Sequence, residues 1–213
     1  MTSADADTGA ARGRLFVVAA PSGAGKTSLV KALRERRPQL CLSVSHTTRP
    51  ARPNELHGRE YFFVAVEEFR KLAAERAFLE HAQVFDNHYG TGRARVEADL
   101  AAGRSVILEI DWQGARQVRA SLPQCVTIFI LPPSRDALEK RLRERRTESD
   151  AAIKRRLRDA VGDMSHWKEF DYVVVNDDFA RALEDLTRIV DSRGEALRAD
   201  RPTLQPLIAE LLA

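Results

Sequence analysis

Four short apolar runs alternate along the chain with longer stretches in which apolar residues recur at helical spacing. The runs predict buried strands at residues 15–20, 105–110, 126–131 and 172–175. The stretches between them predict helices at residues 27–37, 112–121, 134–145, 149–167 and 178–197. Buried strands that alternate with helices are typical of a parallel sheet with helices on both faces. We therefore expect an α/β fold.

A different pattern interrupts this alternation between residues 42 and 85. The apolar runs there are short, and the segments that join them are polar and rich in Pro, Arg and Gly. Short apolar runs separated by turn-forming residues indicate β structure. We expect residues 42–85 to form a small, mostly β insertion in the larger fold.

The remaining segments divide into a core, a lid and two tails. We expect the core to comprise residues 15–41, 86–133 and 170–198, and a helical lid to comprise residues 134–169. Residues 1–14 are expected to be a disordered tail. Residues 199–213 form a C-terminal tail whose apolar residues at helical spacing suit either core packing or a subunit contact.

Composition narrows the class of protein and its partners. A chain of 213 residues is long enough for one substantial core. Its formal net charge of +3 suits anionic substrates and is too small to indicate nucleic acid. Cys41 and Cys125 lack the spacing of a redox or metal pair, so we expect reduced thiols in a cytoplasmic protein. No apolar run reaches the ~20 residues that cross a bilayer, and we expect no membrane partner.

A glycine-rich segment, Ala-Pro-Ser-Gly-Ala-Gly-Lys-Thr, follows the first predicted strand at residues 20–27. It matches the phosphate-loop pattern G-x-x-x-x-G-K-[ST] at every fixed position except the first, where Ala20 replaces glycine. Such a loop turns backbone N–H groups toward phosphates, its lysine reaches the terminal phosphates, and its hydroxyl can hold Mg²⁺. We expect the phosphates of a nucleoside triphosphate to contact Pro21, Ser22, Gly23, Ala24, Gly25, Lys26, Thr27 and Ser28.

A second phosphate-binding candidate lies in the insertion. Arg49 and Arg52 are three residues apart, and Tyr61 follows them. Guanidinium groups bind a phosphate dianion through paired hydrogen bonds, and a tyrosine hydroxyl adds a neutral donor. These residues could form a monophosphate clamp, whereas an isolated arginine-rich loop is more often simply solvated.

Together with the phosphate loop, five further motifs resemble guanylate kinase. In the family's order they are Ser-Val-Ser-His-Thr-Thr-Arg-Pro at 43–50, Phe-Leu-Glu-His-Ala at 78–82, Tyr-Gly-Thr at 89–91, Leu-Glu-Ile-Asp-Trp-Gln-Gly at 108–114 and Val-Asn-Asp-Asp at 175–178. The resemblance spans roughly residues 15–197 and leaves only the tails outside it. It implies that the γ-phosphoryl group of ATP is transferred to GMP, giving ADP and GDP, with Mg²⁺ as cofactor. We expect dGMP to serve as an acceptor too.

The resemblance also implies which residues bind GMP. The residues that would hold the GMP phosphate are Arg49, Arg52, Tyr61 and Tyr89. The residues that would read the guanine are Ser45, Glu80 and Thr91. An ionised Glu80 suits this role because guanine offers two adjacent donors, N1–H and the exocyclic amine, and adenine lacks that pair. Asp111 would complete the acceptor site, and Glu109 would act on the Mg²⁺ held by Thr27 through water.

An excess of positive charge marks the predicted lid. From Arg135 to Arg158 the chain has ten basic and five acidic residues. The resemblance selects Arg141, Arg145 and Arg156 as catalytic residues, with Lys26 and Arg49, that neutralise charge on the transferring phosphoryl group. Arg146 occupies a position that is usually glycine in the family. Asn176 resembles the position that contacts the adenosine end of ATP.

Two other functions are compatible with the same scaffold. A catalytically silent guanylate-kinase-like module would bind proteins in scaffolding assemblies, but the intact Lys26 and Thr27 count against it. A kinase of another phosphorylated acceptor, such as a ribose bisphosphate, would keep the phosphate loop and change the acceptor pocket. Glu80, with Ser45 and Thr91, favours guanine. We expect in-line transfer between the two nucleotides with no covalent enzyme intermediate.

Overall fold

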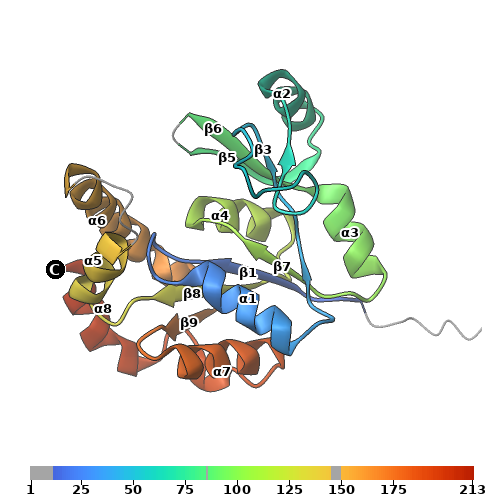
Figure 1. The fold of residues 1–213 in the computed structure, drawn as a ribbon. Coiled ribbons are helices and arrows are strands. Elements are labelled where there is room, and N and C mark those ends of the chain that lie inside the picture. The colour runs from blue at the N-terminus through green and yellow to red at the C-terminus, as the bar shows by residue number, and fades with distance from the viewer. Residues whose placement is uncertain (1–11, 85, 145–149) are drawn as a thin grey trace, which may run out of the picture.

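The computed structural model describes residues 12–84, 86–144 and 150–213, and its largest element is a parallel sheet (Figure 1). The sheet has five strands in the order β2-β7-β1-β8-β9. These strands are β1 (Leu15–Ala19), β2 (Cys41–Leu42), β7 (Val106–Glu109), β8 (Val126–Leu131) and β9 (Tyr172–Val175). The α/β fold and the four predicted strands are confirmed. Leu42 is predicted to begin the insertion, but it belongs with Cys41 to the two-residue β2, which pairs with β7 at the edge of the large sheet.

Helices cover both faces of this sheet, as the apolar strands require. Alternate residues of β1 belong to two separate cores. Phe16 and Val18 pack on the face covered by α1 (Lys26–Arg36) and α7 (Phe179–Val190). Leu15 and Val17 face the core that contains residues of α3 (Arg93–Ala101) and α4 (Trp112–Ser121). Because neither face meets solvent, the strands are continuously apolar.

The insertion forms a second sheet with the order β4-β3-β6-β5, which lies above α4 in the view of Figure 1. Its elements are β3 (His46–Thr47), β4 (Phe62–Phe63), α2 (Val66–Ala74), β5 (Phe78–Val84) and β6 (Asn87–Gly92). The predicted boundary at residue 85 is therefore wrong, since β6 pairs antiparallel with β5 and carries the insertion to Gly92. The polar sequence of β6 lacks the apolar alternation by which strands are predicted.

Two helices form the segment for which we predict a lid, α5 (Arg135–Glu144) and α6 (Asp150–Met164), and η1 (Ser165–Glu169) follows them. Arg143 Nη1 lies 2.6 Å from Asp150 Oδ1 and joins the helices by an ion pair. The helix predicted at 149–167 is α-helical only as far as Met164, and the chain continues from Ser165 as a 3-10 helix. Arg145 and Arg146 lie outside the described residues.

The N-terminal tail departs from its prediction where the structure describes it, whereas the C-terminal tail follows one of its two alternatives. Gly13 N donates to Leu100 O at 2.9 Å and Arg14 N donates to Ser105 Oγ at 3.0 Å, so this part of the N-terminal segment is attached to the core. The C-terminal segment forms η2 (Glu195–Leu197), η3 (Pro202–Leu204) and α8 (Gln205–Leu212). Ile208 and Leu211 of α8 are buried in the same core as α6, which is the core-packing alternative.

The helix predicted at 178–197 is also shorter than expected. It ends at Val190, because Ser192 adopts a left-handed conformation with φ 61° that an α-helix cannot include. Within the described ranges, no helix is both long and apolar enough to span a bilayer.

Candidate active site

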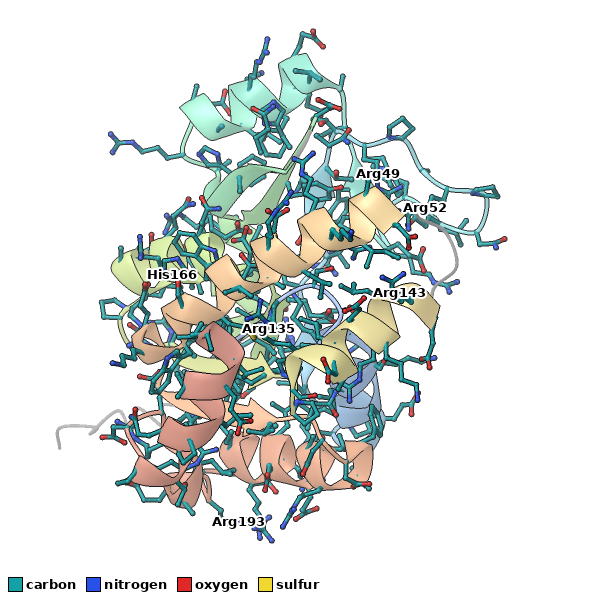
Figure 2. All side chains as sticks on the ribbon, turned by 90° about the vertical axis from the view of Figure 1, so that its left-hand side faces the viewer. Arg49, Arg52, Arg135, Arg143, His166 and Arg193 are labelled. Atoms are coloured by element: carbon teal, nitrogen blue, oxygen red, sulfur yellow. The ribbon has the colours of Figure 1, made fainter. Side chains whose placement is uncertain are left out.

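A cleft of about 800 Å³ opens at the carboxyl ends of β1 and β7. Its walls come from the loop after β1, the start of α4, Gln83 of β5 and one side of α6. Ligand sites of parallel sheets lie at this end of the strands, where adjacent loops converge. In the view of Figure 2, Arg49 and Arg52 of the insertion lie above α5 and its Arg143. The cleft thus has one wall from the core, one from the insertion and one from the lid.

The loop after β1 has the shape that a phosphate requires. Gly23 and Gly25 have φ values of 91° and 93°, which favour glycine. Gly25 ends the loop as the N-cap of α1, and no described side chain caps the N–H groups of the first turn. Asn176 is 5% exposed and donates from Nδ2 to Ala24 O at 2.7 Å, and a Cβ on Gly25 would collide with that amide. In this structure Asn176 holds the loop in place through the carbonyl group of Ala24.

Lys26 connects the loop to the end of the neighbouring strand. Its Nζ donates to Ile110 O at 2.9 Å. Burial lowers the pKa of Lys26, while the carboxylates of Glu109 and Asp111 act in the opposite direction. The lysine is therefore held among acceptors at the bottom of the cleft, where a terminal phosphate would replace the carbonyl as its partner.

Two oxygen ligands converge beside this lysine. Thr27 Oγ1 donates to Glu109 Oε2 at 3.0 Å, which places a hydroxyl and a carboxylate at the mouth of the loop. Among the residues that the structure describes, no group of three or more His, Cys, Asp or Glu side chains could hold a metal ion. Mg²⁺ usually takes only one or two protein oxygens and completes its shell with water and phosphate oxygens. Thr27 and Glu109 fit that requirement.

Two arginines of the lid reach toward the loop from different helices. Arg141 of α5 donates from Nη2 to Asn176 O at 2.8 Å, and its Nη1 is buried with no hydrogen-bond partner among the described residues. Arg156 of α6 donates to the hydroxyl of Ser22 in the phosphate loop. A buried guanidinium nitrogen without a partner is costly, and an anion beside it would remove that cost. The third predicted lid arginine, Arg145, lies outside the described residues.

The residues of the predicted phosphate clamp lie near one another in the insertion, but Arg49 already has an anionic partner. Arg49 Nη2 lies 2.8 Å from Glu55 Oε1. The guanidinium carbon of Arg49 lies 5.5 Å from the ring centre of Tyr61, and the rings of Tyr61 and Tyr89 are 6.0 Å apart. Arg52 joins the group through its backbone N–H, which donates to Glu55 Oε2 at 2.8 Å. The hydrogen bond from Arg49 lowers the pKa of Glu55.

The predicted base-reading residues form a buried pair on adjacent strands. Glu80 is 5% exposed and Thr91 is fully buried, and Thr91 Oγ1 donates to Glu80 Oε1 at 2.6 Å. Burial raises the pKa of Glu80 to about 7. The register that pairs His46 with Gly90 puts the preceding Ser45 at the Thr91 end of β6.

Asp111 has a structural role besides its place in the cleft wall. Its Oδ1 accepts a hydrogen bond from Gly114 N at 2.7 Å, so Asp111 is the N-cap of α4. An N-cap carboxylate satisfies a backbone donor at the positive end of a helix and stabilises the first turn. The residue predicted to serve the acceptor site therefore also fixes where α4 begins.

Sequence reasoning missed several polar residues of the site. Asp159 and Asp163 line the cleft from α6, and Trp112 Nε1 donates to Asp163 Oδ1 at 3.1 Å. Burial raises the pKa of Asp163. The available signal was helical spacing, because Arg156, Asp159 and Asp163 recur every three or four residues and so share one face. Glu55 offered no such signal, since its pairing depends on a turn.

Comparison with known proteins relates the whole chain to one family. The guanylate kinase family model matches residues 12–193. The guanylate kinase of Methylococcus capsulatus is 56% identical over 94% of this chain and 98% of its own length. That of Alkalilimnicola ehrlichii is 53% identical over the same shares. A crystal structure of guanylate kinase from Anaplasma phagocytophilum covers 93% of this chain and 94% of its own, with 33% identity and a TM-score of 0.71.

Proposed function

Because the chain belongs to the guanylate kinase family and transfers a phosphoryl group from ATP to GMP, we propose that its cleft holds the two nucleotides end to end. ATP lies over the phosphate loop, and GMP lies against the insertion. The backbone N–H groups of the loop and the start of α1, from Pro21 to Ser28, bind the triphosphate. Asn176 supports this loop through Ala24 and lies near the adenosine end of ATP.

The acceptor phosphate binds to the clamp formed by Arg49, Arg52, Tyr61 and Tyr89. The two arginines provide charged, forked donors, and the tyrosines provide hydroxyls at the rim. The ion pair between Arg49 and Glu55 occupies the arginine until the phosphate replaces the carboxylate. Asp111 completes the acceptor site from the end of β7.

The base is read by Glu80, Thr91 and Ser45. The buried, hydrogen-bonded pair of Glu80 and Thr91 is the observation that carries the proposal. A phosphate loop suits any nucleoside triphosphate, whereas a buried carboxylate already bound by one hydroxyl needs a ligand with further donors. Guanine provides two on one edge. AMP would leave the carboxylate without those further donors in a place closed to water, and that cost is the physical basis of discrimination.

Transfer itself requires positioning and neutralisation of charge. The acceptor phosphate oxygen is already a nucleophile, so no general base is needed for in-line displacement. Lys26, Arg141 and Arg156 surround the transferring group, and we propose the same role for Arg145, which lies outside the described residues. Thr27 would bind Mg²⁺, with Glu109 acting through water, and the bound ion would neutralise charge on the donor phosphates. Closure of the lid excludes water, which would otherwise compete as acceptor.

The cellular role follows from the products. GDP formed from GMP is the precursor of GTP, so we place the enzyme in purine nucleotide metabolism in the cytoplasm. Since the base-reading pair makes no demand on the sugar, dGMP also fits as an acceptor.

The proposal is tested by comparing acceptors in a coupled assay of ADP release with MgATP. The wild-type protein should prefer GMP and dGMP over AMP, UMP and a ribose bisphosphate. Glu80→Ala should lower the ratio of kcat/KM for GMP to that for AMP by about a hundredfold or more, while KM for ATP stays constant. Glu75→Ala, an exposed carboxylate in the same insertion, is the matched control. An unchanged ratio in Glu80→Ala would refute the role of this residue.

A further inference from the structure

The strand that carries Glu80 is fixed by helix α4 as well as by its own sheet. The side-chain amide of Gln117 makes two hydrogen bonds with the backbone of His81 in β5. Its Nε2 donates to His81 O at 3.1 Å, and its Oε1 accepts from His81 N at 3.2 Å. The amide therefore occupies the place that a neighbouring strand would take. The residue that it holds is adjacent to Glu80.

Gly114, one turn before Gln117, lies against the carboxylate itself. A Cβ at position 114 would lie 2.8 Å from Glu80 Oε2 and 3.3 Å from Glu80 Cδ. Glycine inside a helix is less favourable than alanine by about 0.5–1 kcal/mol. The close approach of the carboxylate is a physical reason for glycine at this position. Positions three apart share one face of a helix, so Gly114 and Gln117 act on β5 together.

The carboxylate of Glu80 is thus confined from three directions. Thr91 holds Oε1, Gly114 limits the position of Oε2, and Gln117 holds the adjacent backbone. The first turn of α4 is in turn fixed by its Asp111 cap at 2.7 Å.

We infer that Gly114 and Gln117 are specificity-positioning residues, which set the place of the Glu80 carboxylate for reading the purine. The inference rests on the proposed function, in which Glu80 reads the base. It adds that purine choice depends on the core helix α4, outside the insertion that carries the other acceptor residues. Lys26 binds Ile110 O, and α4 begins two residues later. The same part of the core therefore positions both the residue that reads the acceptor base and the lysine that binds the donor phosphates.

The first test is Gly114→Ala. The added methyl group meets the end of a side chain, so the carboxylate can move while the fold persists. We expect kcat/KM for GMP to fall about tenfold to a hundredfold, since small displacements of a binding group have effects of this size. kcat/KM for AMP and KM for ATP should change less than threefold. Gly162→Ala in α6 is the matched control, because an added Cβ there has no described atom within 4 Å.

A second variant keeps the inference testable if Gly114→Ala does not fold. Gln117→Ala removes both hydrogen bonds to His81 from a half-buried position. We expect a smaller loss of the GMP preference, about threefold to tenfold, again with KM for ATP unchanged. If both folded variants keep the full preference for GMP over AMP, the inference is wrong.

A double-mutant cycle separates this inference from the proposed function. If Glu80→Ala alone leaves the preference unchanged, the proposed function fails. If Glu80→Ala erodes it and Gly114→Ala does not, only the inference fails. When Gly114 acts through Glu80, adding Gly114→Ala to Glu80→Ala should cause no further loss of preference. A further loss of the same size as in the single variant would show general damage to α4 and overturn the inference.

Discussion

The donor and acceptor halves of the cleft differ in what holds their polar groups in place. In the donor half, side chains mostly contact backbone: Lys26 binds Ile110 O and Asn176 binds Ala24 O. In the acceptor half, side chains contact each other. Arg49 pairs with Glu55, and Thr91 with Glu80. The donor half is therefore built from main-chain geometry, and the acceptor half from compensated charges and dipoles.

This difference separates affinity from specificity. Backbone N–H groups and one lysine recognise phosphates, which all nucleoside triphosphates share. A buried carboxylate recognises a pattern of donors that belongs to one base. Under the proposed function, the acceptor half would also exchange partners on binding, since Glu55 occupies an arginine of the proposed phosphate clamp. Changes in the donor half should affect the rate with any acceptor, and changes in the acceptor half should affect the choice of acceptor or the affinity for it.

The largest effect should follow from removing the donor-half cation. We expect Lys26→Met to lower kcat with MgATP and GMP about a thousandfold, because a positioned cation in a dry site is worth several kcal/mol to the transition state. Steady-state kinetics with GMP and dGMP should show the same loss for both acceptors. Lys31→Met, an exposed lysine of the same helix, should match the wild type. A loss below tenfold in Lys26→Met would contradict this division of roles.

A pH profile should then distinguish the halves without changing the donor site. Burial raises the pKa of Glu80 to about 7, and guanine requires the ionised form. Below that pH the carboxyl is protonated, so kcat/KM for GMP should fall about tenfold per pH unit.

The same profile for Glu80→Gln isolates this group. Its kcat/KM for GMP should be low and should lack the acid limb near pH 7, because the amide does not titrate. The acid limb should also be absent from the profile of the wild-type protein with AMP, whose base does not need the carboxylate. An acid limb that persists in Glu80→Gln would assign it to another group.

The donor half was easier to predict from the sequence than the acceptor half. The loop is contiguous, and it lies between a buried strand and a helix that apolar periodicity predicts well. The acceptor half combines short segments that are far apart in the chain. Asn87–Gly92 has no apolar alternation, so the sequence places β6 in the core, and pairing with β5 and β3 makes it a strand of the insertion. Tertiary contacts determine its conformation there.

The partners of single side chains could not be predicted from the sequence for the same reason. The resemblance to the family supplied Arg49 and Glu80, but no spacing rule links Arg49 to Glu55 or Glu80 to Gly114. The first pair depends on the turn at Pro53 and Asn54, which Glu55 N closes on Arg52 O, and the second on the packing of a helix against a strand. Asp163 was within reach of helical periodicity, whereas its hydrogen bond with Trp112 required the fold.

The smallest expected effect concerns the internal ion pair of the acceptor half. Glu55→Gln keeps the shape of the side chain and one of the two oxygens that accept from Arg49 and Arg52 N, but it removes the charge that competes with the GMP phosphate. We expect KM for GMP to fall about threefold, since ion pairs near the protein surface are weak. Glu60→Gln is the matched control, because Glu60 contacts Leu56 N and Arg59 outside the clamp. A higher KM in Glu55→Gln would show instead that the carboxylate holds Arg49 in its binding position, and that the acceptor half is preorganised like the donor half.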